Sequence, residues 1–270
     1  MFPGVDGFHW TFGHIVFLAL FFAVVLTIVT TVARAVLRSV RDFRTHRVAG
    51  ICWQVEFAEL PDAERRCRHE IARRIEQRTC PNGFDCRGCT EYERYAALPG
   101  HAASSTFGLN YPADRLYHRG HTWVHAEADG VYTVGLDDFA EHLIGEPGAV
   151  QLPEVGSWVE VNGAAWRVRK GRTEVRVRAP MEGEVVATGG PEQGWYLKVR
   201  PQQTPNLRHL LRGEEVSAWI SKELERLQIQ LGPAESAPSL ADGGILMNGL
   251  VDSMPQADWD TVLAGTFLEA

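Results

Sequence analysis

The sequence predicts a mostly β domain with flanking helices, preceded by one N-terminal transmembrane helix. Two observations predict this fold class: an apolar run at 15–33 and short alternating runs, separated by Gly or Pro, from 121 to 199. With 270 residues, 45% of them hydrophobic, the chain can bury a sizeable core, which excludes a wholly disordered or collagen-like protein.

The apolar run Ile15–Ala33 has the length of a membrane-spanning helix, because a helix of this length extends about 28 Å. The first 14 residues contain no Lys or Arg, unlike a signal peptide. Arg34, Arg38 and Arg41 follow the run and share one helix face, which suits anionic lipid headgroups. Since such residues collect on the cytoplasmic side, we expect a single-pass protein of the inner (cytoplasmic) membrane with its N-terminus outside.

Composition divides the chain into six expected segments. They are an extracytoplasmic N-terminus (1–14), a transmembrane helix (15–37), a juxtamembrane helical segment with four Cys (38–98), a linker (99–114), a β domain (115–231) and an acidic tail (232–270). The tail has six acidic residues and no Lys or Arg, so it accounts for most of the net charge of −7. Because the rest is nearly neutral, a nucleic-acid-binding protein is disfavoured. Apolar side chains between the turns of the tail predict that it packs.

Runs bounded by Gly or Pro predict the secondary structure of the β domain and its flanks. The expected strands are His121–Ala126, Val131–Gly135, Trp158–Val161, Trp166–Arg169, Glu174–Arg178, Glu184–Ala187 and Trp195–Val199. The expected helices are Cys67–Thr79, Asp137–Leu143 and Glu214–Gln230. The paired acids at 137 and 138 are expected to cap the second of these helices.

Four cysteines form the strongest chemical motif: Cys67, Cys80, Cys86 and Cys89. The last two are separated by two residues, so they can bind one tetrahedral metal, and four thiolates suit zinc or a [4Fe–4S] cluster. The gap between Cys67 and Cys80 is longer than common ligand spacings, so the alternative that the cysteines bind no metal also remains. His69 is an alternative ligand that we expect to be solvated, and Cys52 is expected to be a buried apolar residue.

Six motifs keep their order and spacing through the β domain: HTWV at 121–124, VGLDDFA at 134–140, LIG at 143–145, LPEVG at 152–156, APMEGEVV at 179–186 and GWYLKV at 194–199. With these motifs the chain resembles the glycine cleavage system H protein. The resemblance implies a biotinyl/lipoyl-like β-sandwich or barreloid fold and a carrier rather than an enzyme. The apolar helix and the cysteines lie outside the usual family domain and resemble membrane-anchored bacterial variants.

The resemblance implies a lipoyl group on a lysine at a hairpin tip, eight residues before the proline that corresponds to Pro180. Arg172 occupies this position, and a guanidinium is a poor acyl acceptor because it stays protonated. The chain has only three Lys, of which Lys170 alone is near the tip. We therefore do not expect lipoate as a cofactor, and Lys170 remains the alternative site.

Arg169, Arg176 and Arg178 alternate with apolar residues along the hairpin and are expected to point outward. They form either a solvated strand face or an electropositive docking face for an acidic partner or anionic lipid. No residues are paired as nucleophile and base, so no catalytic residue is predicted.

Three functions remain open. We expect a non-catalytic, membrane-anchored accessory subunit or docking surface in an integral membrane complex, for which respiratory and photosynthetic assemblies are candidates. The alternatives are a lipoyl or acyl carrier that uses Lys170 and an iron–sulfur electron-transfer protein that uses the four cysteines.

Overall fold

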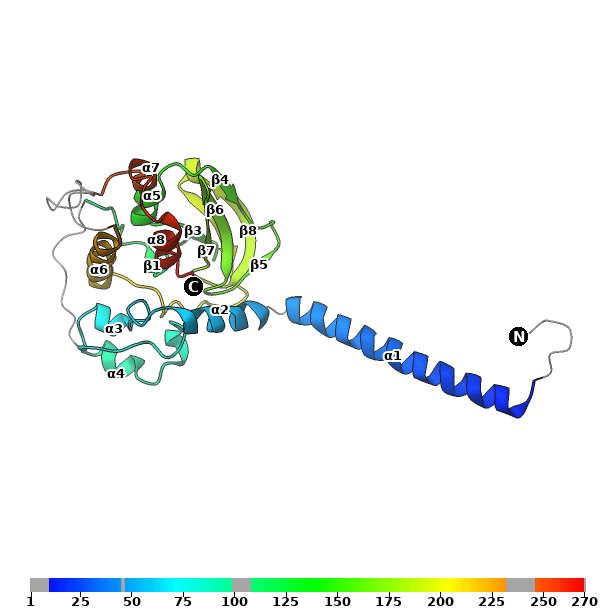
Figure 1. The fold of residues 1–270 in the computed structure, drawn as a ribbon. Coiled ribbons are helices and arrows are strands. Elements are labelled where there is room, and N and C mark those ends of the chain that lie inside the picture. The colour runs from blue at the N-terminus through cyan, green and yellow to red at the C-terminus, as the bar shows by residue number, and fades with distance from the viewer. Residues whose placement is uncertain (1–9, 45–46, 99–107, 232–245, 270) are drawn as a thin grey trace. The chain divides into compact units, whose positions relative to one another are not determined.

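The computed structural model describes residues 10–44, 47–98, 108–231 and 246–269, which belong to two compact units at 1–48 and 49–270. The first unit contains α1 (Phe12–Arg44), one long helix (Figure 1). The hydroxyls of Thr27, Thr30 and Thr31 donate to carbonyls one turn earlier, at 2.7–2.9 Å. These polar groups are thus satisfied inside the helix, as an apolar environment requires.

The part of α1 from Phe12 to Arg34 is long and apolar enough to cross a membrane, with 23 residues and a mean hydropathy of 2.8. Nearly all of its side chains are exposed. Signal sequences share this length and composition. The prediction of an apolar N-terminal helix is confirmed, and membrane insertion stays a prediction.

Two antiparallel sheets form the centre of the second unit (Figure 1). The larger has the strand order β1-β2-β3-β9-β8-β5, and the smaller has the order β4-β6-β7. The strands are β1 (Leu116–His118), β2 (Thr122–Ala126), β3 (Tyr132–Leu136), β4 (Ala149–Gln151), β5 (Trp158–Val159), β6 (Ala164–Lys170), β7 (Thr173–Arg178), β8 (Gly183–Gly190) and β9 (Trp195–Arg200). Alternate side chains of both sheets meet in one core, in which Val134, Val177 and Val185 are fully buried.

All seven predicted strands are present, with small shifts at their ends. The strands β1 and β4 were not predicted, because each has three residues and too few side chains to show an alternation. A short 3₁₀ helix (Pro191–Gln193) connects β8 to β9. The fold class needs one correction: the protein is 38% helical, so it is a β domain with substantial helical cover rather than a mostly β chain.

Two helices of the β domain agree with the sequence. The first, α5 (Asp138–Ile144), is capped by Asp137, whose Oδ1 accepts a hydrogen bond of 2.9 Å from the amide of Ala140. The second, α6 (Glu214–Leu231), buries the predicted apolar face of Val216, Ile220, Leu224 and Leu227. Burial of this face fixes α6 on the sheets.

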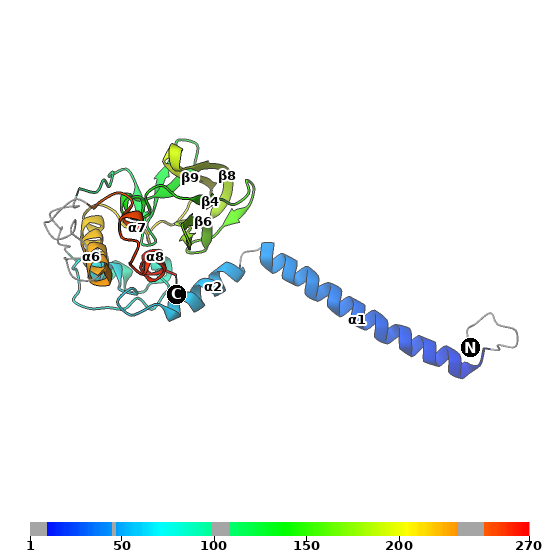
Figure 2. The same cartoon turned by 45° about the horizontal axis from the view of Figure 1, so that its top comes forward.

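Residues 49–98 fold as a small lobe under the sheets and α6 (Figures 1 and 2). Its elements are the greater part of α2 (Arg47–Glu59), α3 (Arg68–Ile71), a 3₁₀ turn (Cys86–Gly88) and α4 (Tyr92–Ala96). Trp53, Phe57, Leu60 and Phe84 form its apolar core together with Leu268. A buried ion pair of Arg68 and Glu215 attaches the lobe to α6.

The helix predicted at Cys67–Thr79 is wrong beyond Ile71. Arg73 adopts a left-handed conformation with φ 53°, which ends the helix. The chain then turns back, so that Arg66 and Thr79 lie opposite each other in an antiparallel bridge. Formation of this long-range pairing overrides the local helical pattern.

The described part of the acidic tail packs against the β domain, as the sequence predicts. It contains α7 (Leu250–Ser253) and α8 (Trp259–Thr266), and α8 lies beside β7 and α6 (Figure 2). Phe267 has no exposed surface and belongs to the main core. Residues 99–107 of the expected linker (99–114) and residues 232–245 of the expected tail (232–270) lie outside the described residues.

Candidate functional site

The β6–β7 hairpin carries the position at which the sequence pattern predicts a modified lysine. Lys170 and Thr173 face each other across the strands, so the turn consists of Gly171 and Arg172. Gly171 has φ 60°, a conformation that residues with a side chain rarely adopt. Arg172 is exposed at the tip. The tip therefore presents a guanidinium instead of an amine.

The amine of Lys170 is held on the side of the hairpin. Its Nζ donates a hydrogen bond of 2.7 Å to the carbonyl of Glu146 and forms an ion pair of 2.6 Å with Oδ2 of Asp252 in α7. Only 13% of the side chain is exposed. The tail thus occupies the amine that the alternative carrier function would need.

The structure corrects the outward placement of Arg176 and Arg178. Arg178 is buried, with an ion pair of 2.6 Å to Glu56 of α2 and a hydrogen bond of 2.8 Å to the carbonyl of Leu268. Arg176 pairs with Glu56 and with Glu269, at 2.9 Å each. Because the tail and α2 cover this face, both guanidinium groups serve internal contacts and are not free for a partner.

These ion pairs connect three distant parts of the chain. Burial disfavours the carboxylate of Glu56, but Arg178 and Arg176 outweigh this effect and lower its pKa. Burial lowers the pKa of Arg178, and Glu56 opposes the change. Removal of Glu56 would therefore leave a buried cation without its main partner.

The cations that remain available near the tip are Arg169 and Arg172. Both are exposed, and neither forms an ion pair with any described residue. Their neighbour Arg167 pairs with Glu174 at 2.9 Å. Of the predicted lipid-facing residues, Arg34 is exposed on α1, whereas the side chains of Arg38 and Arg41 lie outside the described part.

The four predicted metal ligands are all in the lobe. The amide of Cys67 donates to the carbonyl of Arg78, and the amide of Cys80 donates to that of Arg65, at 2.7 and 2.6 Å. This pairing brings Cys67 and Cys80 to adjacent chain segments, and both are electrostatic neighbours of Cys86. Cys52, which we expected to be buried, is exposed.

Within the described ranges, no group of three or more His, Cys, Asp or Glu side chains is arranged to hold a metal ion. The donor chemistry still fits, because the buried cation Arg119 lies among Cys67, Cys80 and Cys86. A positive neighbour of this kind would balance a thiolate-bound metal. His69 is buried rather than solvated, and burial together with Arg68 lowers its pKa to about 4. The metal site stays a prediction.

A buried charge cluster centred on His121 was not predicted. His121 has no exposed surface, and its Nδ1 lies 2.9 Å from Oδ2 of Asp137. Its Nε2 lies 3.8 Å from Oε2 of Glu223, and the rings of Phe139 and Trp219 stack on it at 4.7 Å each. Burial opposes its charge, but Asp137 outweighs burial and raises the pKa of His121 to about 9.

Strand pairing was the only sequence signal for this cluster. In the β2–β3 hairpin, Thr122 faces Leu136, which places residues 121 and 137 side by side. The sequence predicts both strands, but their local patterns do not fix the register between them. The local pattern around Asp137 indicates only its role as a helix cap. Asp137 has both roles, with one carboxylate oxygen for each.

A family comparison matches this part of the chain. The sequence model of the family described as glycine cleavage H-protein covers residues 115–223, which include both hairpins and most of α6. The match ends before the tail and begins after the lobe. The cysteines and the residues that cover the β7 face are therefore additions to the family domain.

Two H proteins from Shewanella agree with the family match. The chain is 32% identical to the glycine cleavage system H protein of Shewanella loihica and 34% identical to that of Shewanella halifaxensis, over 127 residues each. These alignments cover 42% of this chain and 98% of each relative. The crystal structure of an H protein from Mycobacterium marinum is 27% identical, covers 42% of this chain and 98% of that chain, and gives a TM-score of 0.35.

Proposed function

Because the chain belongs to the glycine cleavage H-protein family through residues 115–223, we propose that it is a non-catalytic H-protein-like module of a larger membrane complex. In this proposal α1 anchors the chain in the inner membrane, the N-terminus is outside and the unit at 49–270 is cytoplasmic. The apolar span and the Arg residues that follow it support this orientation. H proteins are carriers rather than catalysts, which agrees with a chain that is not an enzyme.

The main support for the proposal is that the tip of the β6–β7 hairpin presents no accessible amine. Arg172 replaces an amine at the tip, and the nearest amine, Lys170, is engaged by Asp252 and by the carbonyl of Glu146. Carrier function needs an accessible lysine that is presented precisely. A domain that keeps the family fold without this group is better suited to binding a partner.

We propose that the docking surface is the hairpin tip with Arg169 and Arg172, and that it binds an acidic surface of the partner subunit. Both side chains are exposed and have no acidic partner in the described chain, so a partner's carboxylates could pair with them. Anionic lipid is the alternative for the same charges.

Co-purification from native membranes in mild detergent tests this proposal. We expect the full chain to retain a protein complex and the double variant Arg169→Glu, Arg172→Glu to lose it. The matched control Arg200→Glu changes an exposed cation on β9, outside the hairpin, and should retain the complex. A wild-type chain that purifies without partners, or equal retention by all three, would refute the docking function.

Exposed Cys52 allows a test of topology. We expect a membrane-impermeant maleimide to leave it unlabelled in right-side-out vesicles and to label it after permeabilisation. The labelling that is lost in the variant Cys52→Ser is the labelling of Cys52 itself, as distinct from that of the other cysteines. Labelling of Cys52 in intact vesicles would contradict the proposed orientation.

We also propose that the lobe holds a structural zinc ion, bound by Cys67, Cys80, Cys86 and Cys89. The gathering of the thiols in one lobe and the buried Arg119 beside three of them support it. Elemental analysis should find one zinc per chain, which Cys86→Ser loses. Iron with broad visible absorption would instead favour the electron-transfer function, and absence of metal would refute both.

A further inference from the structure

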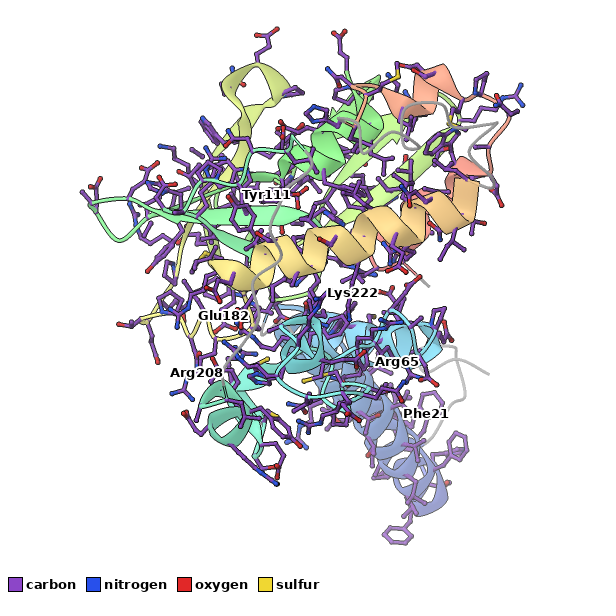
Figure 3. The ribbon with its side chains drawn as sticks, turned by 90° about the vertical axis from the view of Figure 1, so that its left-hand side faces the viewer. Phe21, Arg65, Tyr111, Glu182, Arg208 and Lys222 are labelled. Carbon is purple, nitrogen blue, oxygen red and sulfur yellow. The ribbon has the colours of Figure 1, made fainter. Side chains whose placement is uncertain are left out.

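A cavity of about 360 Å³ lies between α6 and the lobe. Its walls come from residues 63–71, from α6, from Arg119 before β2 and from Leu268 near the C-terminus. Figure 3 shows Lys222 on the side of α6 that faces the lobe, with Arg65 on the lobe segment beneath it. The volume is in the range of small-molecule sites, and no residue of the β6–β7 hairpin lines it.

Two cations that line the cavity, Arg66 and Lys222, lack close partners in the described chain. Arg66 and Lys222 both point to one oxygen, Oε1 of Glu70, at 3.7 and 3.9 Å. These distances exceed a hydrogen bond, and within the described residues neither side chain donates one to the protein. Burial and the charge of Arg66 lower the pKa of Lys222, as expected for an amine that lacks a close carboxylate. Because two cations share one carboxylate oxygen, N–H groups of both side chains are left without a protein acceptor in the described chain.

Glu64 lines the same cavity and forms part of its closed wall. Its Oε2 is buried and accepts no hydrogen bond, and its other oxygen lies 3.7 Å from Arg226. Burial raises the pKa of this carboxyl group, and Arg226 opposes the change. Arg226 itself is engaged by Glu223 at 2.5 Å, so Arg66 and Lys222 remain as the donors for a ligand.

The remaining wall is apolar. Trp219, Ile71 and Leu268 line the cavity, and Ile229 is 76% exposed at its edge. A ligand that fits both parts needs an oxyanion that can accept from two cations and a short apolar substituent. A phosphate monoester meets both needs, because its phosphate oxygens can accept hydrogen bonds from Arg66 and Lys222 at the same time.

We propose that this cavity binds a phosphate monoester with a short apolar substituent. Arg66 and Lys222 donate to the phosphate oxygens, and the substituent lies against Trp219 and Ile229. The site goes beyond the docking function and is independent of it, because the two share no residue.

Calorimetric titration of the full chain in a neutral detergent with butyl phosphate tests the site. We expect saturable binding at one site per chain, and about tenfold or greater weakening in Arg66→Gln and in Lys222→Gln, as for loss of a hydrogen bond to a charged group. Arg94→Gln, an exposed cation outside the cavity, is the matched control and should bind as the wild type does. Ile229→Glu changes a residue that is mostly exposed, so it should fold, and it should also weaken binding.

The ligand series separates the parts of the site. Inorganic phosphate and 1-butanol should each bind at least about tenfold more weakly than butyl phosphate, since each lacks one half of the ligand. Displacement of butyl phosphate by phosphatidate in the micelles would identify a lipid headgroup as the ligand, and absence of displacement would identify a soluble ester. Absence of butyl phosphate binding, or binding that the three cavity variants leave unchanged, would overturn the proposal.

Discussion

Raising the pH should destabilise the protein through His121. The pKa of this buried imidazole is raised from 6.5 to about 9, chiefly by Asp137 acting against burial. Because the pKa is raised in the folded state, the protonated imidazole stabilises the folded protein. This contribution to the free energy of unfolding is fully present below pH 6.5 and is lost as the pH passes 9. The difference of 2.5 pKa units between 6.5 and about 9 corresponds to about 3 kcal/mol of unfolding free energy.

Urea unfolding of the full chain in neutral detergent, at pH 6.5 and at about pH 9.5, measures this loss. Trp219 stacks on the imidazole, so near-ultraviolet circular dichroism reports on the cluster. To isolate the contribution of His121, the wild type is compared with Asp137→Asn, in which the main source of the raised pKa is absent. We expect a clearly smaller pH dependence in the variant. Equal pH dependence in both proteins, or a wild type as stable at the higher pH, would refute the reasoning.

Three further predictions concern the contacts of the hairpin and the tail. Glu56→Gln leaves Arg178 buried without its carboxylate and should cost about 3 kcal/mol or more in urea unfolding, whereas Glu59→Gln, on the same helix, should cost little. Asp252→Asn should expose Lys170, so that acetylation by a succinimidyl ester, mapped by mass spectrometry, becomes faster; an unchanged rate would contradict the tail contact. Phe267→Ala empties a fully buried site and should cost about 3–5 kcal/mol, and a loss below 1 kcal/mol would show that the tail is not packed.

The sequence predicted the parts of the fold that local patterns encode. The alternation in β6 and β7 was sufficient to locate both strands, and the apolar spacing in α6 was sufficient to identify its buried face. The helix expected at Cys67–Thr79 failed because a bridge between Arg66 and Thr79, thirteen positions apart, competes with the local preference.

The candidate site was predicted less completely than the fold. The resemblance to the H-protein family implies Arg172 at the hairpin tip, and the structure places it there. The burial of Arg178 could not be predicted, because its partners Glu56 and Leu268 lie far away in the chain, on elements whose docking on β7 leaves no local pattern. Alternation indicates which side chains leave one sheet face, but not what covers the opposite face.

The central claim is that the chain keeps the H-protein fold without carrying a lipoyl group, and the intact mass of the full chain from native membranes tests it most directly. We expect the wild type and Lys170→Ala each to have the mass calculated from its own sequence, with no lipoyl group added. A wild-type mass increased by one lipoyl group, with the increase lost in Lys170→Ala, would contradict it.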